Sequence, residues 1–218
     1  MIDYKLIRSD RKTLSLEIDR DGVLLVRAPK RMDQETIERF IESRERWIRK
    51  KQQLMRERRE IVQPDTRGVE TVWYLGRQYR IERQDEPRVD FHDDVMLIPR
   101  SWSQAHLIAW LKSTCKFQMQ MRVPMLAAGM DVQPTGIHVT DARTRWGSCS
   151  GKNSVNFAWR LIFCPSDVIN YVIIHELCHI RHKDHSAAFW KMVAKYDPNY
   201  ETHKAWLNDH AALMDLFR

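Results

Sequence analysis

The segment His175-Glu176-Leu177-Cys178-His179 constrains this chain more than any other, because it places two histidines and a glutamate in the pattern H-E-x-x-H. Residues 172–174 before it are apolar, so we expect the motif to lie on a helix. Residues four positions apart on a helix share one face, so both imidazoles can approach one ion at about 2.0–2.1 Å from each nitrogen. The pattern therefore predicts a metal-binding helix.

Zinc chemistry explains the glutamate between the two histidines. Zinc lowers the pKa of a bound water toward about 7, and a carboxylate that is not itself a ligand can then take the proton. Glu176 is therefore the predicted general base. A catalytic zinc also needs three protein ligands and one open position, so a third ligand must come from elsewhere in the chain.

Two further histidines follow the motif. His182 is seven residues after His175, and at ~1.5 Å per residue the rise between them along one helix is roughly 10 Å, which is too far for two ligands of one ion. His185 follows a polar stretch at which the chain is expected to turn back, so its imidazole can approach from a new direction. We prefer His185 as the third ligand and keep Glu201 as the alternative.

Other polar residues near the motif have less specific roles. Asp184 or Glu201 could orient a ligand histidine through its second ring nitrogen. One of Tyr196, Tyr200 and His203 could stabilise a developing oxyanion. The plainer alternative is that the histidines are helix-surface or core residues without a metal, and the helical setting with a nearby third histidine favours the metal site.

The spacing of apolar residues predicts an α+β fold. An Asp-Gly turn at residues 21–22 predicts a β-hairpin within residues 5–28, and Asp33 is a good N-cap for a helix that runs to about residue 60. Residues 64–68 are interpreted as a linker. Further strands are expected at residues 69–75, 78–83, 95–98, 137–140, 144–150 and 155–163. Further helices are expected at residues 103–127, where Pro124 should kink or end the helix, from the N-cap Ser166 through the motif, from the N-cap Ser186 to residue 195, and at residues 200–216.

The sequence resembles the YgjP-type metallopeptidase family, zincins that are related to the SprT and WLM groups. The resemblance rests on Arg145-Trp146-Gly147-Ser148-Cys149 and on residues 156–162, 171–179 and 185–190, whereas the N-terminal half matches only in its order of elements. The resemblance implies zinc as the cofactor, His175, His179 and His185 as its ligands, and Glu176 as the base.

The resemblance also implies the arrangement of the chain. We expect an N-terminal β-rich lobe with a long helix over residues 1–100. Residues 101–218 should form a zincin-like catalytic lobe, in which the H-E-x-x-H helix packs on a small mixed sheet. The spacing from His179 to His185 equals that of the metzincins, but those enzymes have Gly where this chain has His182. Gly supplies a positive φ for the sharp turn, so a metzincin assignment is disfavoured.

Composition limits the setting and the partners. Of the 218 residues, 43% are hydrophobic and 30% are charged, as in folded globular proteins. No signal sequence and no run of eighteen apolar residues is present, so we expect neither secretion nor a membrane span. Cys115, Cys149, Cys164 and Cys178 form no C-x-x-C pair, which favours reduced thiols in the cytoplasm, with Cys178 an ordinary buried thiol.

A net charge of +7 and a pI of about 9.3 raise the prospect of a polyanionic partner such as nucleic acid. The densest basic segment, residues 39–59, also contains glutamates, and this mixture is more typical of a solvated helix face. Arg143 and Arg145 could bind a substrate carboxylate or phosphate, although a structural role beside Trp146 is equally open. Asn156 could present its amide to the substrate, but hydrogen bonding between strand and loop is favoured.

Three hypotheses about function follow. The first is peptide-bond hydrolysis of a peptide or protein substrate, which would add as a strand to the edge formed by residues 144–150. The second is phosphoanhydride hydrolysis of a nucleoside triphosphate such as UTP, with Arg143 and Arg145 holding the phosphates. The third is a nucleic-acid-associated protease or a plain binding module, by analogy with SprT relatives.

Overall fold

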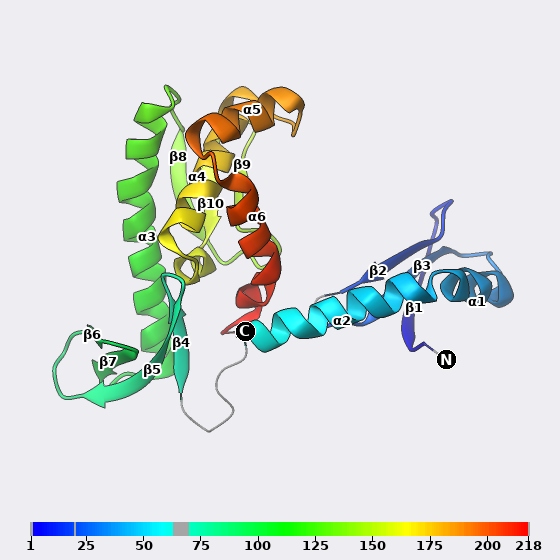
Figure 1. Cartoon of the computed structure of the whole chain (residues 1–218), viewed down its shortest axis with the longest axis horizontal. Helices are drawn as coiled ribbons and strands as arrows, with labels where there is room; N and C mark the ends of the chain where they lie inside the picture. The colour runs from blue at the N-terminus through cyan, green and yellow to red at the C-terminus, as the bar shows by residue number, and fades with distance from the viewer. Residues whose placement is uncertain (1, 20, 63–69, 218) are drawn as a thin grey trace. The chain divides into compact units, whose positions relative to one another are not determined.

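The computed structural model describes residues 2–19, 21–62 and 70–217, and the side chains of residues 58–62 are not described (Figure 1). Its contacts divide the chain into two units, Met1–Gln63 and Pro64–Arg218. The expected linker at residues 64–68 lies outside the described residues. Among the described helices, none has both the length and the apolar composition needed to cross a membrane. Both units contain helices and strands, so the chain is a mixed α+β protein, as expected.

The first unit is a three-stranded sheet covered by two helices. Its elements are β1 (Tyr4–Ser9), β2 (Ser15–Ile18), β3 (Leu24–Pro29), α1 (Gln34–Ser43) and α2 (Glu45–Val62). The sheet order is β1-β3-β2, and β2 pairs with β3 antiparallel, which confirms the predicted hairpin. The turn is closed by the Asp19 carboxylate, which accepts the N–H groups of Asp21 and Val23 at 2.9 and 2.8 Å. Strand β1 runs parallel to β3.

The helix expected from Asp33 to about residue 60 is two helices. Asp33 caps α1 as predicted, because its carboxylate accepts the Thr36 N–H at 2.7 Å. The chain then breaks at Arg44, whose N–H bonds to the Ile41 carbonyl, while the Ser43 hydroxyl donates to the Phe40 carbonyl. These local bonds end α1 in a tight turn and let α2 start in a new direction. The core of the unit consists of buried residues from β3 and both helices: Leu24, Val26, Ala28, Ile37, Ile41 and Ile48.

The second unit begins with a four-stranded sheet in the order β4-β5-β7-β6. Its strands are β4 (Thr71–Tyr74), β5 (Arg77–Gln84), β6 (Asp90–His92) and β7 (Val95–Pro99). Strand β6 was not predicted, because three residues with an aspartate at one end do not show an apolar alternation. The turn between β4 and β5 is fixed to the C-terminal elements: the N–H groups of Leu75 and Gly76 bond to the carbonyls of Ile162 and Phe163, each at 2.9 Å. The boundary expected at residue 100 therefore falls inside the second unit.

Gly76 is required at that turn. Its φ is +85°, and a Cβ there would lie 2.6 Å from Pro165. Pro165 is the residue that precedes the helix of the H-E-x-x-H motif. The first sheet of the unit thus abuts the start of the functional helix.

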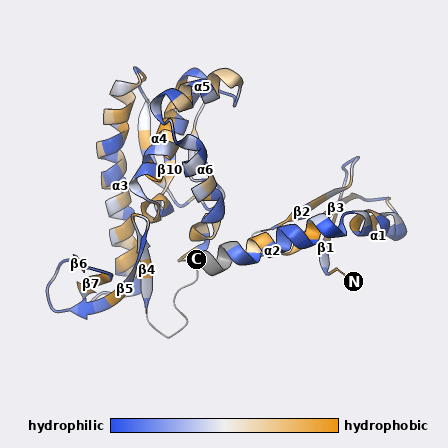
Figure 2. Ribbon diagram, in the orientation of Figure 1, coloured by the Kyte–Doolittle hydropathy of each residue, from blue (hydrophilic) through white to orange (hydrophobic). Residues whose placement is uncertain are grey.

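The second unit contains a long helix, α3 (Gln104–Gly129), which is shown in Figure 1. The apolar spacing predicts a core face made of Leu107, Ile108, Leu111, Cys115, Met119 and Val123. All of them are at 1% exposure or less except Ile108, which is only partly buried. Figure 2 shows hydrophobic and hydrophilic bands alternating along this helix. Pro124 does not end the helix, which continues to Gly129. This proline lies on the exposed side, where water can bond to the carbonyl that it leaves without a donor.

A second sheet lies against α3, in the order β8-β10-β9. Its strands are β8 (Gly136–Thr140), β9 (Gly147–Cys149) and β10 (Ser154–Ala158), with β10 parallel to β8 and antiparallel to β9. The strand expected at residues 155–163 ends at Ala158. The remaining residues form a buried 3-10 helix, η1 (Trp159–Phe163), in which Arg160 donates to Asp141 and to the carbonyls of Leu216 and Phe217.

The remaining elements are α4 (Ser166–Arg181), α5 (Ala187–Tyr196), α6 (Tyr200–Asp209) and the 3-10 helix η2 (Ala211–Asp215). The N-cap of α4 is Pro165 and not Ser166, which is already the first helical residue and whose hydroxyl accepts a hydrogen bond from Arg122 at 3.2 Å. Ser186 is the N-cap of α5, as expected. The last predicted helix, residues 200–216, is interrupted at His210, the C-cap of α6.

Candidate metal centre

Helix α4 carries the H-E-x-x-H motif into the interior of the second unit. Nine of its residues are buried: Val168, Ile169, Tyr171, Val172, Ile173, Ile174, Glu176, Leu177 and Cys178. The helix packs against α3, α5, α6 and β9, so it is enclosed on several sides. It ends at Arg181, and His182 has an extended backbone with φ −125°. The turn after the motif therefore needs no positive φ, and His182 fits where metzincins have Gly.

The two motif histidines lie one helical turn apart on one face of α4. Their ring centroids are 5.0 Å apart. Nδ1 of His179 donates a hydrogen bond to the His182 carbonyl at 2.9 Å. Because this bond places the proton on Nδ1, the neutral ring keeps its lone pair on Nε2. The backbone at the end of α4 thus fixes the tautomer of His179, a candidate metal ligand.

His185 reaches the same point from the loop between α4 and α5. Its Nε2 lies 3.2 Å from Nε2 of His175, and its ring centroid is 4.7 Å from that of His179. One nitrogen from each of the three histidines lies within 4.8 Å of the others. The loop is set by the Asp184 carboxylate, which accepts the Ser186 N–H at 3.1 Å. The structure brings together the three histidines that the sequence predicted.

A buried phenylalanine supports all three rings. Phe189 of α5 has no exposed surface, and its ring centroid lies 4.9, 4.5 and 4.8 Å from those of His175, His179 and His185. Trp190 adds a stacked contact to His185 at 5.7 Å. Helix α5 therefore holds the imidazoles by packing. Nδ1 of His175 is buried without a hydrogen-bond partner among the described residues, so packing alone orients that ring.

The donor set fits a zinc ion. Two nitrogens that bind one tetrahedral ion at about 2.0–2.1 Å lie roughly 3.3 Å apart, close to the 3.2 Å between His175 and His185. Burial, with smaller contributions from the neighbouring histidines, lowers the pKa of His175 to about 3. Burial also lowers the pKa of His179. Both imidazoles are therefore neutral at physiological pH, and the neutral ring is the form that binds metal.

Glu176 lies in a tight enclosure formed by β9. The residue is 6% exposed, and burial raises the pKa of its carboxyl to about 8, with the charge of Arg145 acting in the opposite direction. A Cβ on Gly147 would lie 2.7 Å from both Cγ and Oε1 of Glu176, so only glycine fits beside this side chain. The side chain therefore lies against β9, and Glu176 follows His175 directly on α4.

The predicted substrate-binding residues have different surroundings. Arg143 and Arg145 are exposed on the segment before β9. Asn156 donates from Nδ2 to the Ser148 and Ser154 carbonyls at 3.3 and 3.5 Å, which links β10 to β9 and agrees with the strand-to-loop role favoured by the sequence.

Each of the three candidates for stabilising an oxyanion contacts another side chain. The Tyr200 hydroxyl donates to Glu201 at 3.2 Å, and its ring stacks on Trp190. His203 bonds through Nδ1 to the buried Asp197 at 2.8 Å. Tyr196 lies under the Lys195 ammonium, 4.9 Å from the ring centroid. These contacts do not single out one of the three.

The remaining residues considered from the sequence have structural contacts. Asp184 bonds to the backbone of Ser186 and Glu201 to Tyr200, and neither has a hydrogen bond to a ligand histidine among the described residues. Cys178 is fully buried, and burial raises the pKa of its thiol to about 12, as befits an ordinary core residue.

Sequence reasoning missed three contributors to the site: the His182 carbonyl, Phe189 and Gly147. A backbone acceptor has no sequence signature. Phe189 resembles any other core aromatic residue, and a glycine in a short strand does not reveal which side chain it faces. For Phe189, the usable signal was its place in the apolar stretch of residues 187–190 that follows His185 in the chain.

Comparison with known proteins assigns the family. The model described as "YgjP-like, metallopeptidase domain" matches residues 12–210. The chain belongs to the YgjP-like family. Its resemblance to this family, expected from the sequence, is confirmed, and the family supports a metal-dependent hydrolase of the metallopeptidase type.

Two individual proteins show weaker similarity. The UTP pyrophosphatase of Escherichia coli (strain K12) is 26% identical over 65 residues, which span 30% of this chain and 39% of that protein. The crystal structure of the metallopeptidase zymogen of Pyrococcus abyssi abylysin has 16% sequence identity and a TM-score of 0.38, over 41% of this chain and 92% of that chain. Neither similarity is close enough to transfer a substrate.

Proposed function

We propose that the chain is a zinc-dependent peptidase, with His175, His179 and His185 as metal ligands and Glu176 as general base. The observation that carries the proposal is the convergence of three histidine nitrogens within 4.8 Å, with the buried Glu176 next to His175 in the chain. A zinc ion held there would act as a Lewis acid and lower the pKa of water toward about 7. The family supports a metallopeptidase-type hydrolase, and zinc is the metal that this donor set suits best.

Glu176 would perform the proton transfers. Its carboxylate would accept the proton of the attacking water and later deliver it to the leaving amine. The side chain of Glu176 lies so close to Gly147 of β9 that this strand limits its movement on that side. Burial raises the pKa of this carboxyl to about 8, and the charge of Arg145 only partly offsets it. The positive charge of a zinc ion held by the three histidines would therefore be needed to favour the ionised form that a base requires.

Strand β9 offers a place for the substrate. It is an edge strand, paired only with β10 among the described residues, and it contacts α4 next to Glu176. An extended peptide that pairs with this edge would pass close to the carboxylate with its backbone held by hydrogen bonds. Such a mode selects unfolded or extended segments.

A second candidate function, phosphoanhydride hydrolysis, is favoured by two cations beside the site. Arg145 precedes β9, and its charge acts to lower the pKa of Glu176. The Lys204 ammonium of α6 lies 4.4 Å from the Trp190 ring centroid, and its charge contributes to lowering the pKa of His175. Neither has an ion pair within the part of the chain that the structure describes. Lys204 also lines an open hollow of about 370 Å³ together with Trp190 and Tyr200. An aromatic wall with a cation suits a nucleotide.

The two functions are separated by one set of assays. The zinc-loaded protein and its Glu176→Gln variant would be compared on a peptide library and on nucleoside triphosphates. We expect peptide cleavage that falls by about 10²–10⁴-fold in the variant, because a general base contributes that much, with unchanged zinc content. Triphosphate turnover that depends on Glu176, without any peptide cleavage, would replace the first proposal with the second.

A further inference from the structure

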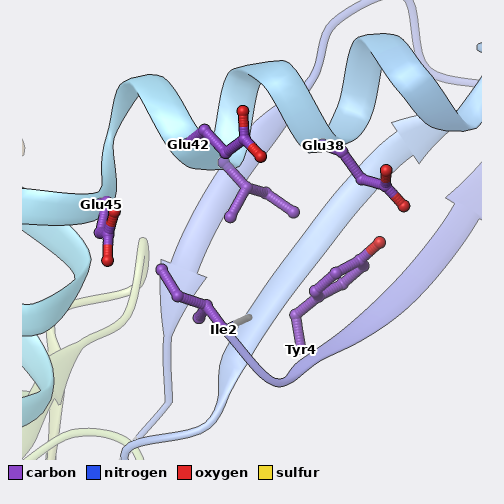
Figure 3. A pocket seen from close by; sticks show the side chains of 6 residues that line it. Ile2, Tyr4, Glu38, Glu42 and Glu45 are labelled. Atoms are coloured by element: carbon purple, nitrogen blue, oxygen red, sulfur yellow. The ribbon is translucent and has the colours of Figure 1, made fainter.

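The first unit contains an apolar groove that the proposed hydrolysis does not use. It has a volume of about 270 Å³. Figure 3 shows Ile2 and Tyr4 on one side of the groove and glutamates from the helices on the other. The residues that line it are Ile2, Tyr4, Glu38, Ile41, Glu42 and Glu45. The floor is thus apolar and the rim is acidic.

Two of the rim carboxylates have no cationic partner among the described residues. Glu38 accepts a hydrogen bond only from the Gln34 amide, at 2.9 Å, and the same amide nitrogen bonds to the Tyr4 hydroxyl at 2.6 Å. Glu42 is exposed and forms no ion pair with any residue that the structure describes. Glu45 pairs with Arg49, four residues later on α2, at 2.6 Å. In a chain with a net charge of +7, this concentration of negative charge is complementary to a basic group.

The groove also reaches the start of an unpaired strand edge. Strand β1 is an outer strand of its sheet and pairs only with β3 in the described part of the unit. Tyr4 of β1 lines the groove, whereas the next residue, Lys5, is exposed and by strand alternation points to the opposite face. A strand added along β1 would therefore place every second side chain beneath the glutamates and the others beside Lys5.

We propose that this groove binds an extended, basic segment of a partner protein, which adds to the free edge of β1. Lysine or arginine side chains at alternate positions lay their apolar stems over Ile2, Tyr4 and Ile41 and direct their charges to Glu38 and Glu42. The residues between them are uncharged or acidic, because Lys5 repels further cations. The proposal concerns the first unit alone and requires neither a metal nor turnover.

The test measures binding of a fluorescent peptide of alternating lysine and threonine to the full-length chain. The protein carries Glu176→Gln, so that turnover cannot consume the probe. A peptide with the same composition but its lysines in one block is the control for charge alone. We expect the alternating peptide to bind roughly tenfold more tightly than the block peptide, with an affinity that falls as salt rises. Equal affinities, or no binding of either peptide, would overturn the proposal.

Charge reversals locate the site. Reversal of both rim residues, Glu38→Lys and Glu42→Lys together, should weaken binding of the alternating peptide by about tenfold or more, since each lost exposed pair is worth up to about fivefold and each new lysine adds repulsion. The control pairs Glu35→Lys with Glu57→Lys, at two exposed positions of α1 and α2 outside the groove; it makes the same change of charge and should weaken binding less than twofold. All four side chains are exposed, and the melting temperature of each variant shows whether it is folded under the conditions of the binding assay.

Equal weakening by the control and the rim variants would show that only net charge matters, and would reject the groove. Sedimentation of the parent protein over a range of concentrations addresses a different occupant. Self-association that the alternating peptide fails to displace, and that the rim reversals abolish, would assign the groove to a second copy of this chain and reject the proposal.

Discussion

The contact between Gly147 and Glu176 gives the sharpest prediction. A methyl group at residue 147 would lie 2.7 Å from Cγ and Oε1 of Glu176, whereas ordinary contact begins at 3.4 Å. In Gly147→Ala the carboxylate must therefore move by about 0.7 Å, the difference between these two distances, or β9 must move away from α4. Glu176 is buried on its other sides, so neither adjustment is free.

The expected effects follow from that displacement. Overpacking of this kind costs about 1–3 kcal/mol of unfolding free energy. A general base displaced by nearly 1 Å loses about 10–100-fold in kcat. Zinc content should remain at that of the parent protein, because the three atoms nearest to a Cβ at residue 147 all belong to Glu176 and none to a ligand histidine. Urea denaturation, metal analysis and turnover of the best substrate from the library measure the three quantities.

Gly151→Ala is the matched control. It makes the same substitution two residues beyond β9, and a Cβ there meets no atom within 4 Å. It should change stability by less than about 0.5 kcal/mol and leave activity intact. A Gly147→Ala protein that equals this control in both stability and kcat would refute the close enclosure of Glu176.

Three further predictions concern the support of the site. The buried Arg160 guanidinium donates a hydrogen bond to Asp141 at 2.6 Å and lowers the pKa of that carboxyl to about 2, below its usual value of about 3.9. The stability that this pair contributes should therefore be complete above about pH 4 and fall between about pH 4 and 2, and urea titrations should show that Asp141→Asn removes this pH dependence. Phe189→Ala should lower the free energy of unfolding by about 3–5 kcal/mol and also weaken zinc binding, measured by calorimetry. A variant that loses stability but binds zinc as tightly as the parent protein would show that Phe189 does not support the site. Zinc at 100 times its Kd should stabilise the protein by about 2.7 kcal/mol, and a chelator should reverse the shift in Tm; an equal zinc effect in His185→Ala would remove that residue from the ligand set.

Much of the site was predictable because helical periodicity is strict. The spacing of His175 and His179 already places both rings on one face, and the rise per residue excludes His182. The polar stretch before His185 correctly indicated a return of the chain. What the sequence could not supply was the environment of Glu176, because the proximity of Gly147 depends on how β9 packs against α4.

The secondary structure was predictable where the sequence pattern that encodes it spans only a few residues. It was less predictable where tertiary contacts determine whether a segment forms a helix or a strand. The hairpin of β2 and β3 and the N-cap Asp33 are encoded within a few residues. The break at Arg44 was hidden because apolar spacing continues through it into α2. Residues 159–163 have the composition of a strand, but their burial between α3 and the chain end around Phe217 favours a 3-10 helix, and such competition is not visible in the sequence.

The most direct test of the proposed centre is X-ray absorption at the zinc edge of the protein loaded with one equivalent of zinc. We expect three imidazole nitrogens at about 2.0–2.1 Å and one light atom from solvent, with the imidazole signal reduced in His175→Ala, His179→Ala and His185→Ala alike. A sulfur shell at about 2.3 Å, or a spectrum that these substitutions leave unchanged, would contradict the three-histidine site.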